Sequence, residues 1–516
     1  MDRRKNAVLW IAARLLEGEL GLDALKREAA GKFRLDEFPK NSRILEAFPK
    51  GKLTPKIAAL LKRKPMRTLS GVAPVAVMVR PGGSCRWGCI YCPYTGNAPK
   101  SYTGSEPAAR RARDNDFSPE RQVKSRLGQF ALNGHPTDKC DVIVMGGTFL
   151  AMDPKYADEF VKGIYEGLNG RKTNGLVEAK KMNEGASHRM AGLTFETRPD
   201  VCGKKEIERM LEYGGTKVEL GVQNPSDGIY RKINRGHSVA DVAKATALLK
   251  DAGLKVAYHI MPGLPGSSPS KDVEMFRKVF ADGRFRPDML KIYPTLVIPH
   301  TGLEKMMEAG EFTPYRTGEA AEVIAQAYKY IPEYVRVMRI QRDIPSDLIS
   351  EGVKKSNLRE LVEKRAQELG IQINEIRHRE AGLSGLGAGK PELARMEYDA
   401  SGGREIFLSM EDKKSGALSA FLRLRIPKRS WKKEIGGSAA IVRELHVFGQ
   451  ETPLGERGEV QHRGLGSALL SEAERIAFGE FGKQKMAVIS AVGVRKYYFA
   501  RGYSPEGPYV SKEIGE

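Results

Sequence analysis

Cysteine is scarce in this chain, with five in 516 residues. So small and odd a number provides no disulfide framework, and a long chain with few cysteines is typical of a reducing compartment. No apolar run reaches the roughly 20 residues that a membrane-spanning helix needs. The basic start at residues 1–5 leads into an apolar stretch, 8–14, that is too short for a signal peptide. These absences argue against a disulfide scaffold and a membrane protein, and predict a cytoplasmic one.

Three of the five cysteines nevertheless fall within eight residues. Cys85, Cys89 and Cys92 directly follow the apolar run 75–79. The Cys-x3-Cys-x2-Cys spacing lets one loop ligate three irons of a cubic iron–sulfur cluster and leaves the fourth iron open for a small molecule. The alternative is a zinc knuckle, which normally takes a fourth cysteine or histidine at short spacing. The nearest such residue is His135, so the spacing favours the cluster.

Apolar strands and amphipathic helices alternate after this loop. Strands are expected at 75–79, 141–145, 192–196, 217–222, 255–259 and 289–293. Six strands separated by helical segments indicate parallel β/α units over residues 73–342, in either an open sheet or a partial barrel. In both, the chemistry gathers at the carboxyl ends of the strands.

The cysteine loop resembles that of the radical S-adenosylmethionine enzymes. In that family a 4Fe-4S cluster binds S-adenosyl-L-methionine through its open iron and cleaves it to a 5'-deoxyadenosyl radical. The resemblance implies a partial (β/α)6 barrel, with the three cysteines as metal ligands and Cys89 also as a catalytic residue. It further implies that Gly146 and Gly147 hold the methionine amine through their backbone and that Glu196 contacts the cofactor.

Positive charge is concentrated near the start of the chain. The formal net charge is +21, and residues 1–80 hold 18 Lys or Arg against 8 Asp or Glu. Residues 1–72 read as small helices with basic runs at 50–56 and 62–67, and a second basic cluster, 110–113, follows the cysteine loop. A solvated basic face is the simpler alternative. The cluster beside the cysteine loop favours a nucleic acid that is brought to this loop through phosphate contacts.

The pattern changes again in the last quarter of the chain. A glycine-rich stretch closes a segment, 343–391, that we interpret as a linker, and residues 392–516 then show strands at 405–410, 417–425 and 439–448 before a helix at 466–478. This order resembles the α+β fold of the GCN-related N-acetyltransferases. The run 461–466 fits the family signature Gln/Arg-x-x-Gly-x-Gly/Ala, in which N–H groups at the start of a helix bind the pyrophosphate of coenzyme A.

The whole chain resembles the family of the catalytic subunit of the Elongator complex, which modifies tRNA. The segments that carry this resemblance are 101–107, 144–149, 196–200, 234–237, 290–298, 341–345, 442–447 and 507–509. It implies an acyltransferase that uses the 5'-deoxyadenosyl radical and acetyl-CoA to install a carboxymethyl group on carbon 5 of the wobble uridine. The implied acetyl-CoA contacts are Lys139, Glu444, Leu445, His446, Val447, Gln461, Gly464, Leu465, Gly466, Ser467 and Tyr498.

The resemblance also assigns roles and partners. Lys139 and Tyr498 are expected to act in catalysis as well as in binding, and residues 1–72 are expected to bind the anticodon stem-loop of tRNA. An external electron donor is needed, no membrane is involved, and homo-oligomers or accessory subunits stay open. One rival function is a protein lysine acetyltransferase of the histone type, which would use only the last domain. The other is a non-enzymatic RNA-binding scaffold.

Overall fold

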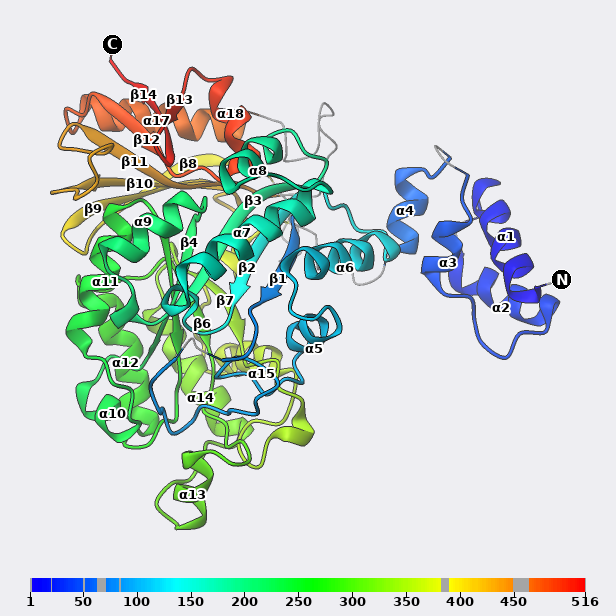
Figure 1. Cartoon of the computed structure of the whole chain (residues 1–516), viewed down its shortest axis with the longest axis horizontal. Coiled ribbons are helices and arrows are strands. Elements are labelled where there is room, and N and C mark those ends of the chain that lie inside the picture. Colours follow the sequence, from blue (N-terminus) through cyan, green and yellow to red (C-terminus); the bar gives the residue numbers. More distant parts are fainter. Residues whose placement is uncertain are drawn as a thin grey trace.

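The computed structural model describes residues 2–19, 21–49, 52–62, 71–82, 85–381, 389–448 and 464–515. Four short helices come first and form a small bundle that lies beside the rest of the molecule, next to α6 (Figure 1). They are α1 (Arg3–Leu16), α2 (Leu22–Phe33), α3 (Asn41–Glu46) and α4 (Pro55–Leu61). Ile11 and Leu15, one helical turn apart on α1, are buried against Leu25 and Ile44. The bundle therefore has its own apolar core, while its exposed faces keep their charges.

The second unit is a seven-stranded, entirely parallel sheet in which the strands follow the order of the chain. Its strands are β1 (Ala73–Met78), β2 (Lys139–Met145), β3 (Arg189–Thr197), β4 (Lys217–Gln223), β5 (Lys255–Ile260), β6 (Met289–Ile292) and β7 (Arg336–Ile340). Alternate side chains point to opposite faces, so Val218 and Leu220 pack under the outer helices while Glu219 faces the concave side. The α/β fold and the six expected strands are confirmed, and β7 is a strand that the sequence did not reveal.

Helices cover the outer face of this sheet (Figure 1). They include α6 (Pro119–Leu132), α7 (Pro154–Asn169), α8 (Leu176–Asn183), α9 (Lys204–Glu212), α10 (Asp227–Lys232), α11 (Val239–Asp251), α12 (Pro269–Ala281) and α14 (Thr317–Ala327). By contrast, α5 (Pro107–Asp114) packs on Met78 and Met145, and α13 (Gly302–Glu308) lies by the cysteine loop, where the Leu303 N–H donates to the Ile90 carbonyl. Short 3-10 turns accompany them at η2 (Phe149–Ala151), η3 (Pro199–Val201) and η4 (Tyr328–Tyr330). Several begin with proline after a capping Ser or Asp, the usual start of a helix.

The segment that we interpreted as a linker is packed rather than extended. It forms η5 (Ser346–Leu348), α15 (Leu358–Glu368) and α16 (Ile376–Arg379). The Ile376 backbone N–H donates to the Val335 carbonyl, and the Ala381 N–H donates to the Leu418 carbonyl in the next sheet. The segment thus contacts both sheets. Most of its glycine-rich stretch, 382–388, lies outside the described residues, and the domain limits stay predictions.

The last unit is a second seven-stranded sheet of mixed direction, ordered β13-β14-β12-β11-β10-β9-β8. Its strands are β8 (Glu392–Ala400), β9 (Gly403–Glu411), β10 (Leu418–Pro427), β11 (Ala439–Val447), β12 (Lys485–Val488), β13 (Ser504–Glu506) and β14 (Tyr509–Glu513), with α17 (Leu465–Gly479), η6 (Val492–Val494) and α18 (Arg495–Phe499). Leu422 and Val442 pack against α17, whereas Phe421 and Ile441 join the core of the first sheet. The two sheets therefore share one continuous apolar core.

A buried ionic network joins the two sheets. Arg443 on β11 donates to both carboxylate oxygens of Asp288, at 2.9 and 2.5 Å, and to Glu405 at 2.9 Å, and all three side chains are fully buried or nearly so. Asp288 immediately precedes β6, and Arg443 also donates to the carbonyl of Leu254, just before β5. The second sheet therefore packs against the amino ends of the strands in the first. Among the described residues, no helix is long and apolar enough to cross a membrane.

Candidate functional site

The three clustered cysteines line one cavity of about 160 Å³ at the carboxyl ends of the parallel strands. Cys89 is 6% exposed. The side chain of Lys100 holds the cysteine loop through two of the loop's backbone carbonyl oxygens. Lys100 Nζ donates to the carbonyl of Trp87 at 2.5 Å and lies 3.4 Å from that of Cys85. The loop is thus closed on itself, with its thiols turned inward.

Two buried arginines face the central thiol. Arg235 Nη1 lies 3.5 Å and Arg198 Nη1 lies 3.9 Å from Cys89 Sγ. A hydrogen bond from Cys92 and the charges of Arg235 and Arg198 lower the pKa of Cys89 to about 4, although burial opposes this. His237 is a neutral acceptor for Arg235 Nε at 3.0 Å, because burial and the nearby arginines lower the pKa of His237 to about 3. The thiolate form that a metal requires is therefore favoured.

The backbone after β2 approaches this cavity closely. Gly146 has a φ of +152°, and a Cβ at this position would lie 2.4 Å from Val79 Cγ2, so only glycine fits. Gly147 and Glu196 line the cavity. Glu196 accepts a hydrogen bond from the Tyr102 hydroxyl at 2.6 Å and faces the Gly146 N–H at 3.5 Å. Bare backbone next to a carboxylate fits the amino group and hydroxyls of a small polar cofactor.

Three ionisable side chains on the concave face were not among the site residues expected from the sequence. Glu219, His259 and Lys291 come from β4, β5 and β6 and line the same cavity as the cysteines. In the sheet register Glu219 is paired with Glu196, and His259 with Lys291. Two acidic residues directly across a sheet are destabilising, so the pairing of Glu219 with Glu196 indicates a functional demand. The signal in the sequence was a charged residue at an inward position in each of three successive strands.

The second sheet contains a stretch of unpaired strand edge. β11 pairs with β12 only over its first four residues, from Ala439 to Val442, whereas it pairs with β10 as far as Val447. Within the part of the chain that is described, no strand pairs with the other edge of β11 beyond Val442. The predicted coenzyme contacts Glu444, Leu445, His446 and Val447 occupy this unpaired stretch. Free backbone N–H and C=O groups there suit the amides of an extended pantetheine arm.

The start of α17 meets the same region. Gly464, with a φ of +81°, precedes the helix, and the N–H groups of the next residues lack a partner in the helix itself. Arg501 was not singled out from the sequence; it donates to the Ser467 hydroxyl at 2.7 Å and lies over the Tyr497 ring at 3.6 Å. Leu465 and Gly466 start the helix, while Gln461 lies outside the described residues. A guanidinium beside a helix N-terminus is a suitable pyrophosphate site.

Two predicted residues of this sheet differ in burial: His446, expected as a coenzyme contact, is half-buried, whereas Tyr498, expected in catalysis, is buried. His446 stacks on Phe421 and packs at a tilt against Phe448, its Nε2 has no hydrogen-bond partner among the described residues, and burial lowers the pKa of His446. Tyr498 packs in the core, and burial raises its pKa. The neighbouring Tyr497 has a buried hydroxyl without a partner among the described residues. This hydroxyl lies 2.8 Å from the position that a Cβ on Gly466 would take. The role of Tyr498 stays a prediction.

Lys139 and Glu444 mark where the two units meet. Lys139 is the first residue of β2, at the amino end of the parallel sheet on which the second sheet packs. Burial opposes ionisation of Glu444, but the charges of Lys255 and Arg423 lower its pKa. Lys255 is the first residue of β5. The unpaired stretch of β11 is therefore electrostatically coupled to the amino end of the barrel.

The basic surface is only partly as expected. Arg110 and Arg113 on α5 are exposed, but Arg111 is buried and donates to the Ala76 carbonyl at 2.8 Å. Arg111 is thus a structural residue that anchors α5 to β1. Of the basic runs in the first 72 residues, most of 62–67 and part of 50–56 lie outside the described residues.

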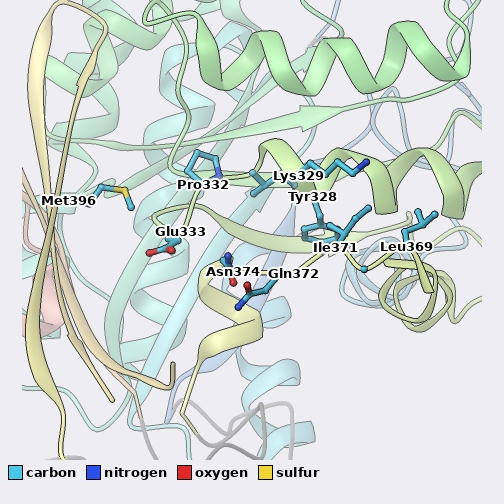
Figure 2. Close-up of a pocket in the computed structure, with 11 residues that line it drawn as sticks. Tyr328, Lys329, Pro332, Glu333, Leu369, Ile371, Gln372, Asn374 and Met396 are labelled. Carbon is cyan, nitrogen blue, oxygen red and sulfur yellow. The ribbon is translucent and has the colours of Figure 1, made fainter. Parts of the chain in front are cut away.

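A larger hollow of about 500 Å³ lies elsewhere on the surface, between η4, the loop after α15 and β8 (Figure 2). Its wall includes Lys329, Glu333, Gln372, Asn374 and Met396. None of its lining residues is a cysteine or histidine. We therefore assign the chemistry to the smaller cavity at the cysteines.

Comparison with known families places three parts of the chain. The model of the radical SAM superfamily matches residues 79–279, that of the Radical_SAM C-terminal domain residues 287–368, and that of the ELP3 N-terminal domain residues 7–69. Membership of this superfamily carries with it the 4Fe-4S cluster and S-adenosyl-L-methionine, the two cofactors expected from the cysteine loop.

Similar proteins extend over nearly the whole chain. A protein of Methanocaldococcus infernus, tRNA uridine(34) acetyltransferase, is 48% identical, over 96% of this chain and 95% of its own length. Elongator complex protein 3 of Homo sapiens is 41% identical, over 96% and 94%. The structure of the archaeal Methanocaldococcus infernus Elp3 with an N-terminal deletion (1-46) superposes with a TM-score of 0.78 at 47% identity, and covers 87% of this chain and 100% of that one. On this similarity in sequence and structure, the chain belongs to the family of the tRNA uridine(34) acetyltransferases and Elongator complex protein 3.

Proposed function

We propose that this protein installs a carboxymethyl group on carbon 5 of the wobble uridine of tRNA, with the acetyl group of acetyl-CoA as the carbon source. The observation that carries the proposal is that two candidate binding sites lie on two sheets that pack against each other. A cavity lined by three cysteines lies at the carboxyl ends of the parallel strands. The unpaired edge of β11, which is suited to bind a coenzyme, lies on the sheet that packs against the amino ends of those strands. Names of relatives that act on tRNA uridine(34) support the substrate.

The cysteines and their neighbours fit an iron–sulfur cluster. Cys85, Cys89 and Cys92 would hold it, with the Cys89 thiolate favoured by the two buried arginines. When bound, the cluster and S-adenosyl-L-methionine supply a 5'-deoxyadenosyl radical that abstracts hydrogen from a carbon. The backbone at Gly146 and Gly147 would orient the methionine amine, and the surrounding buried side chains exclude water from the reacting atoms.

The second sheet would bind acetyl-CoA. The unpaired stretch from Glu444 to Val447 would hold the pantetheine arm, and the start of α17 with Arg501 would hold the pyrophosphate. Lys139 lies at the end of the parallel sheet that faces this unit, where its charge would guide the acidic coenzyme. One C–H bond of the acetyl methyl group would break as its hydrogen passes to the 5'-deoxyadenosyl radical, and the methyl carbon would bond to carbon 5 of the uracil. Carbon 5 would then lose its hydrogen as a proton, with release of the one electron that the reductant supplied, and hydrolysis of the thioester by water would release free coenzyme A.

The partners follow from this chemistry. The exposed charges of the first helices and of α5 would contact tRNA phosphates, and a reductant from outside the chain would supply electrons to the cluster. One relative is named Elongator complex protein 3, and on this name we include accessory subunits among the proposed partners. We place the reaction in the cytoplasm, where tRNA is used.

A protein lysine acetyltransferase is the competing function. It would need a general base near the thioester that can take a proton at neutral pH. Burial lowers the pKa of His446 and its ring packs against Phe421 and Phe448, while Glu444 accepts a hydrogen bond from Arg423 at 2.8 Å. Neither residue is well suited to that role, which supports the radical reaction instead.

The test is an anaerobic reconstitution with iron and sulfide. The protein is incubated with tRNA, S-adenosyl-L-methionine, a reductant and acetyl-CoA carrying ¹³C in its methyl group, and the nucleosides are then analysed by mass spectrometry. We expect ¹³C-labelled carboxymethyluridine that disappears in a Cys89→Ala variant. Release of coenzyme A without a modified nucleoside, or acetylation of a lysine-rich protein instead, would contradict the proposal.

A further inference from the structure

The concave face of the parallel sheet holds a group of ionisable side chains to which no role has been assigned above. Glu219, His259 and Lys291 project from three neighbouring strands into the cavity that the cysteines line. Glu219 Oε2 accepts a hydrogen bond from Lys291 Nζ and lies 2.9 Å from His259 Nε2. The Glu219 side chain is 1% exposed, while those of Lys291 and His259 are 11% and 15% exposed. The group is therefore buried but keeps a face toward the cavity.

One atom of this group has no partner. Glu219 Oε1 is buried and accepts no hydrogen bond in the described residues. A buried acceptor without a donor costs about 1–3 kcal/mol, and more when it is charged. Native proteins rarely keep such an atom unless an ordered water or a ligand supplies the missing donor.

Both charges are permanent. Burial opposes ionisation of Glu219, but the Lys291 ammonium and the hydrogen bond from His259 hold its pKa well below the ordinary value. Burial likewise disfavours the charged form of Lys291, but Glu219 raises its pKa. The cavity thus presents a fixed carboxylate acceptor beside a fixed ammonium donor.

The carboxylate of Glu219 and the ammonium of Lys291 limit which ligands can bind beside them in the cavity. A divalent cation is disfavoured, although carboxylate and imidazole atoms of Glu196, Glu219 and His259 lie within 4.8 Å of one another, because the Lys291 ammonium already neutralises Glu219. A thioester offers only acceptor atoms and leaves Glu219 Oε1 without a donor. The Watson–Crick edge of uracil offers both kinds of atom: its N3–H is a donor, and the adjacent O4 carbonyl is an acceptor.

We propose that Glu219 and Lys291 read the uracil edge of the target nucleotide, Glu219 Oε1 accepting the N3–H and Lys291 Nζ donating to O4, with His259 holding the carboxylate in place. The proposal rests on the function proposed above. Enzymes that act on a base move it out of its stack and read its Watson–Crick edge in this manner. Cytosine would be rejected, because its N3 acceptor would face the carboxylate and its N4 amino group would face the ammonium.

The test uses three anticodon stem-loop RNAs that differ only at the wobble position, which carries uridine, 3-methyluridine or cytidine. Sites that pair a polar group of the substrate reject analogues without it by about 10⁴- to 10⁵-fold at best. We expect the wild-type protein to modify the 3-methyluridine and cytidine RNAs at least about 100-fold more slowly than the uridine RNA. Equal modification of uridine and 3-methyluridine would overturn the proposal without any variant.

Variants then assign the effect to the residues. Glu219→Gln keeps the shape but exchanges an acceptor for an amide, and we expect kcat/KM for the uridine RNA to fall at least about tenfold, which corresponds to one lost hydrogen bond to a charged group. Formation of 5'-deoxyadenosine should persist, uncoupled from the modification, because the cysteine loop is untouched. The matched control is Glu274→Gln, at a side chain that is 55% exposed on α12, which should behave as wild type.

The outcomes separate this inference from the function on which it rests. If the wild-type protein modifies no uridine RNA, the proposed function fails. If it does so and Glu219→Gln retains the wild-type rate and base preference, only the uracil-reading role fails.

Discussion

Replacing Arg443 by alanine should uncouple the two sheets. The Arg443 guanidinium is fully buried and donates to Asp288, Glu405 and the carbonyl of Leu254. Its removal leaves the buried carboxylates of Asp288 and Glu405 with fewer counter-charges. Lys250, at 3.4 Å from Asp288, is one of those that remain. Removing one partner of a buried ion pair typically costs 3–5 kcal/mol, because the other charge stays buried without compensation.

Hydrogen exchange measures this loss where it occurs. If the strands open locally, about 3–5 kcal/mol corresponds to exchange that is roughly 10²- to 4 × 10³-fold faster, at about tenfold per 1.4 kcal/mol, in peptides that span β10 and β11. The matched control is Arg395→Ala, since Arg395 pairs with Glu480 at a side chain that is 29% exposed. A pair of this kind is worth about 0–1 kcal/mol. Exchange within threefold of wild type in Arg443→Ala, or an equal effect in the control, would refute the reasoning.

Four further predictions test other parts of the molecule. Burial lowers the pKa of Lys250 from 10.5 to about 8, so between pH 8 and 10.5 the unfolded chain binds a proton that the folded chain lacks. As the pH rises through this window, the free energy of unfolding of the wild type should increase by up to about 3 kcal/mol relative to that of Lys250→Met, measured by urea unfolding. Parallel pH profiles of the two proteins would contradict this. Gly146→Ala places a Cβ 2.4 Å from Val79 Cγ2 at a φ of +152°, and should cost about 1–3 kcal/mol and reduce 5'-deoxyadenosine formation at least about tenfold, whereas a wild-type rate would disprove the need for close backbone approach. Arg501→Gln should raise the KM for acetyl-CoA roughly tenfold with unchanged 5'-deoxyadenosine formation in steady-state assays, and an unchanged KM would remove Arg501 from the coenzyme site. Arg110→Gln should lower the slope of log K for tRNA against log salt by about 1, and an identical slope would mean that this exposed residue touches no phosphate.

The strands that the sequence predicted are those with continuous apolar runs. β7 was missed because Arg336–Ile340 carries two arginines, and burial is supplied mainly by Val337 and Ile340. β8 was missed because it is an edge strand with alternating charges and an exposed Leu393. In both strands tertiary pairing, rather than local composition, decides the structure.

The cysteine loop could be predicted because its three ligands are adjacent in the chain. The group of Glu219, His259 and Lys291 could not, because 40 and 72 residues separate Glu219 from the other two and only the parallel register brings them together. The buried Arg111 shows the opposite error. A run of arginines looks like a binding surface until the helix turns one of them inward.

The parallel sheet is an open arc. Its hydrogen-bonded order runs from β1 to β7, and in the described residues these two outermost strands do not pair with each other. Arg342, just after β7, reaches across to the Ser101 carbonyl beyond the cysteine loop. A closed barrel is fixed in width by a complete ring of strand pairing, whereas side-chain contacts such as this one join the two ends of the arc. The width of the mouth at the cysteines can therefore change without the loss of any strand pairing.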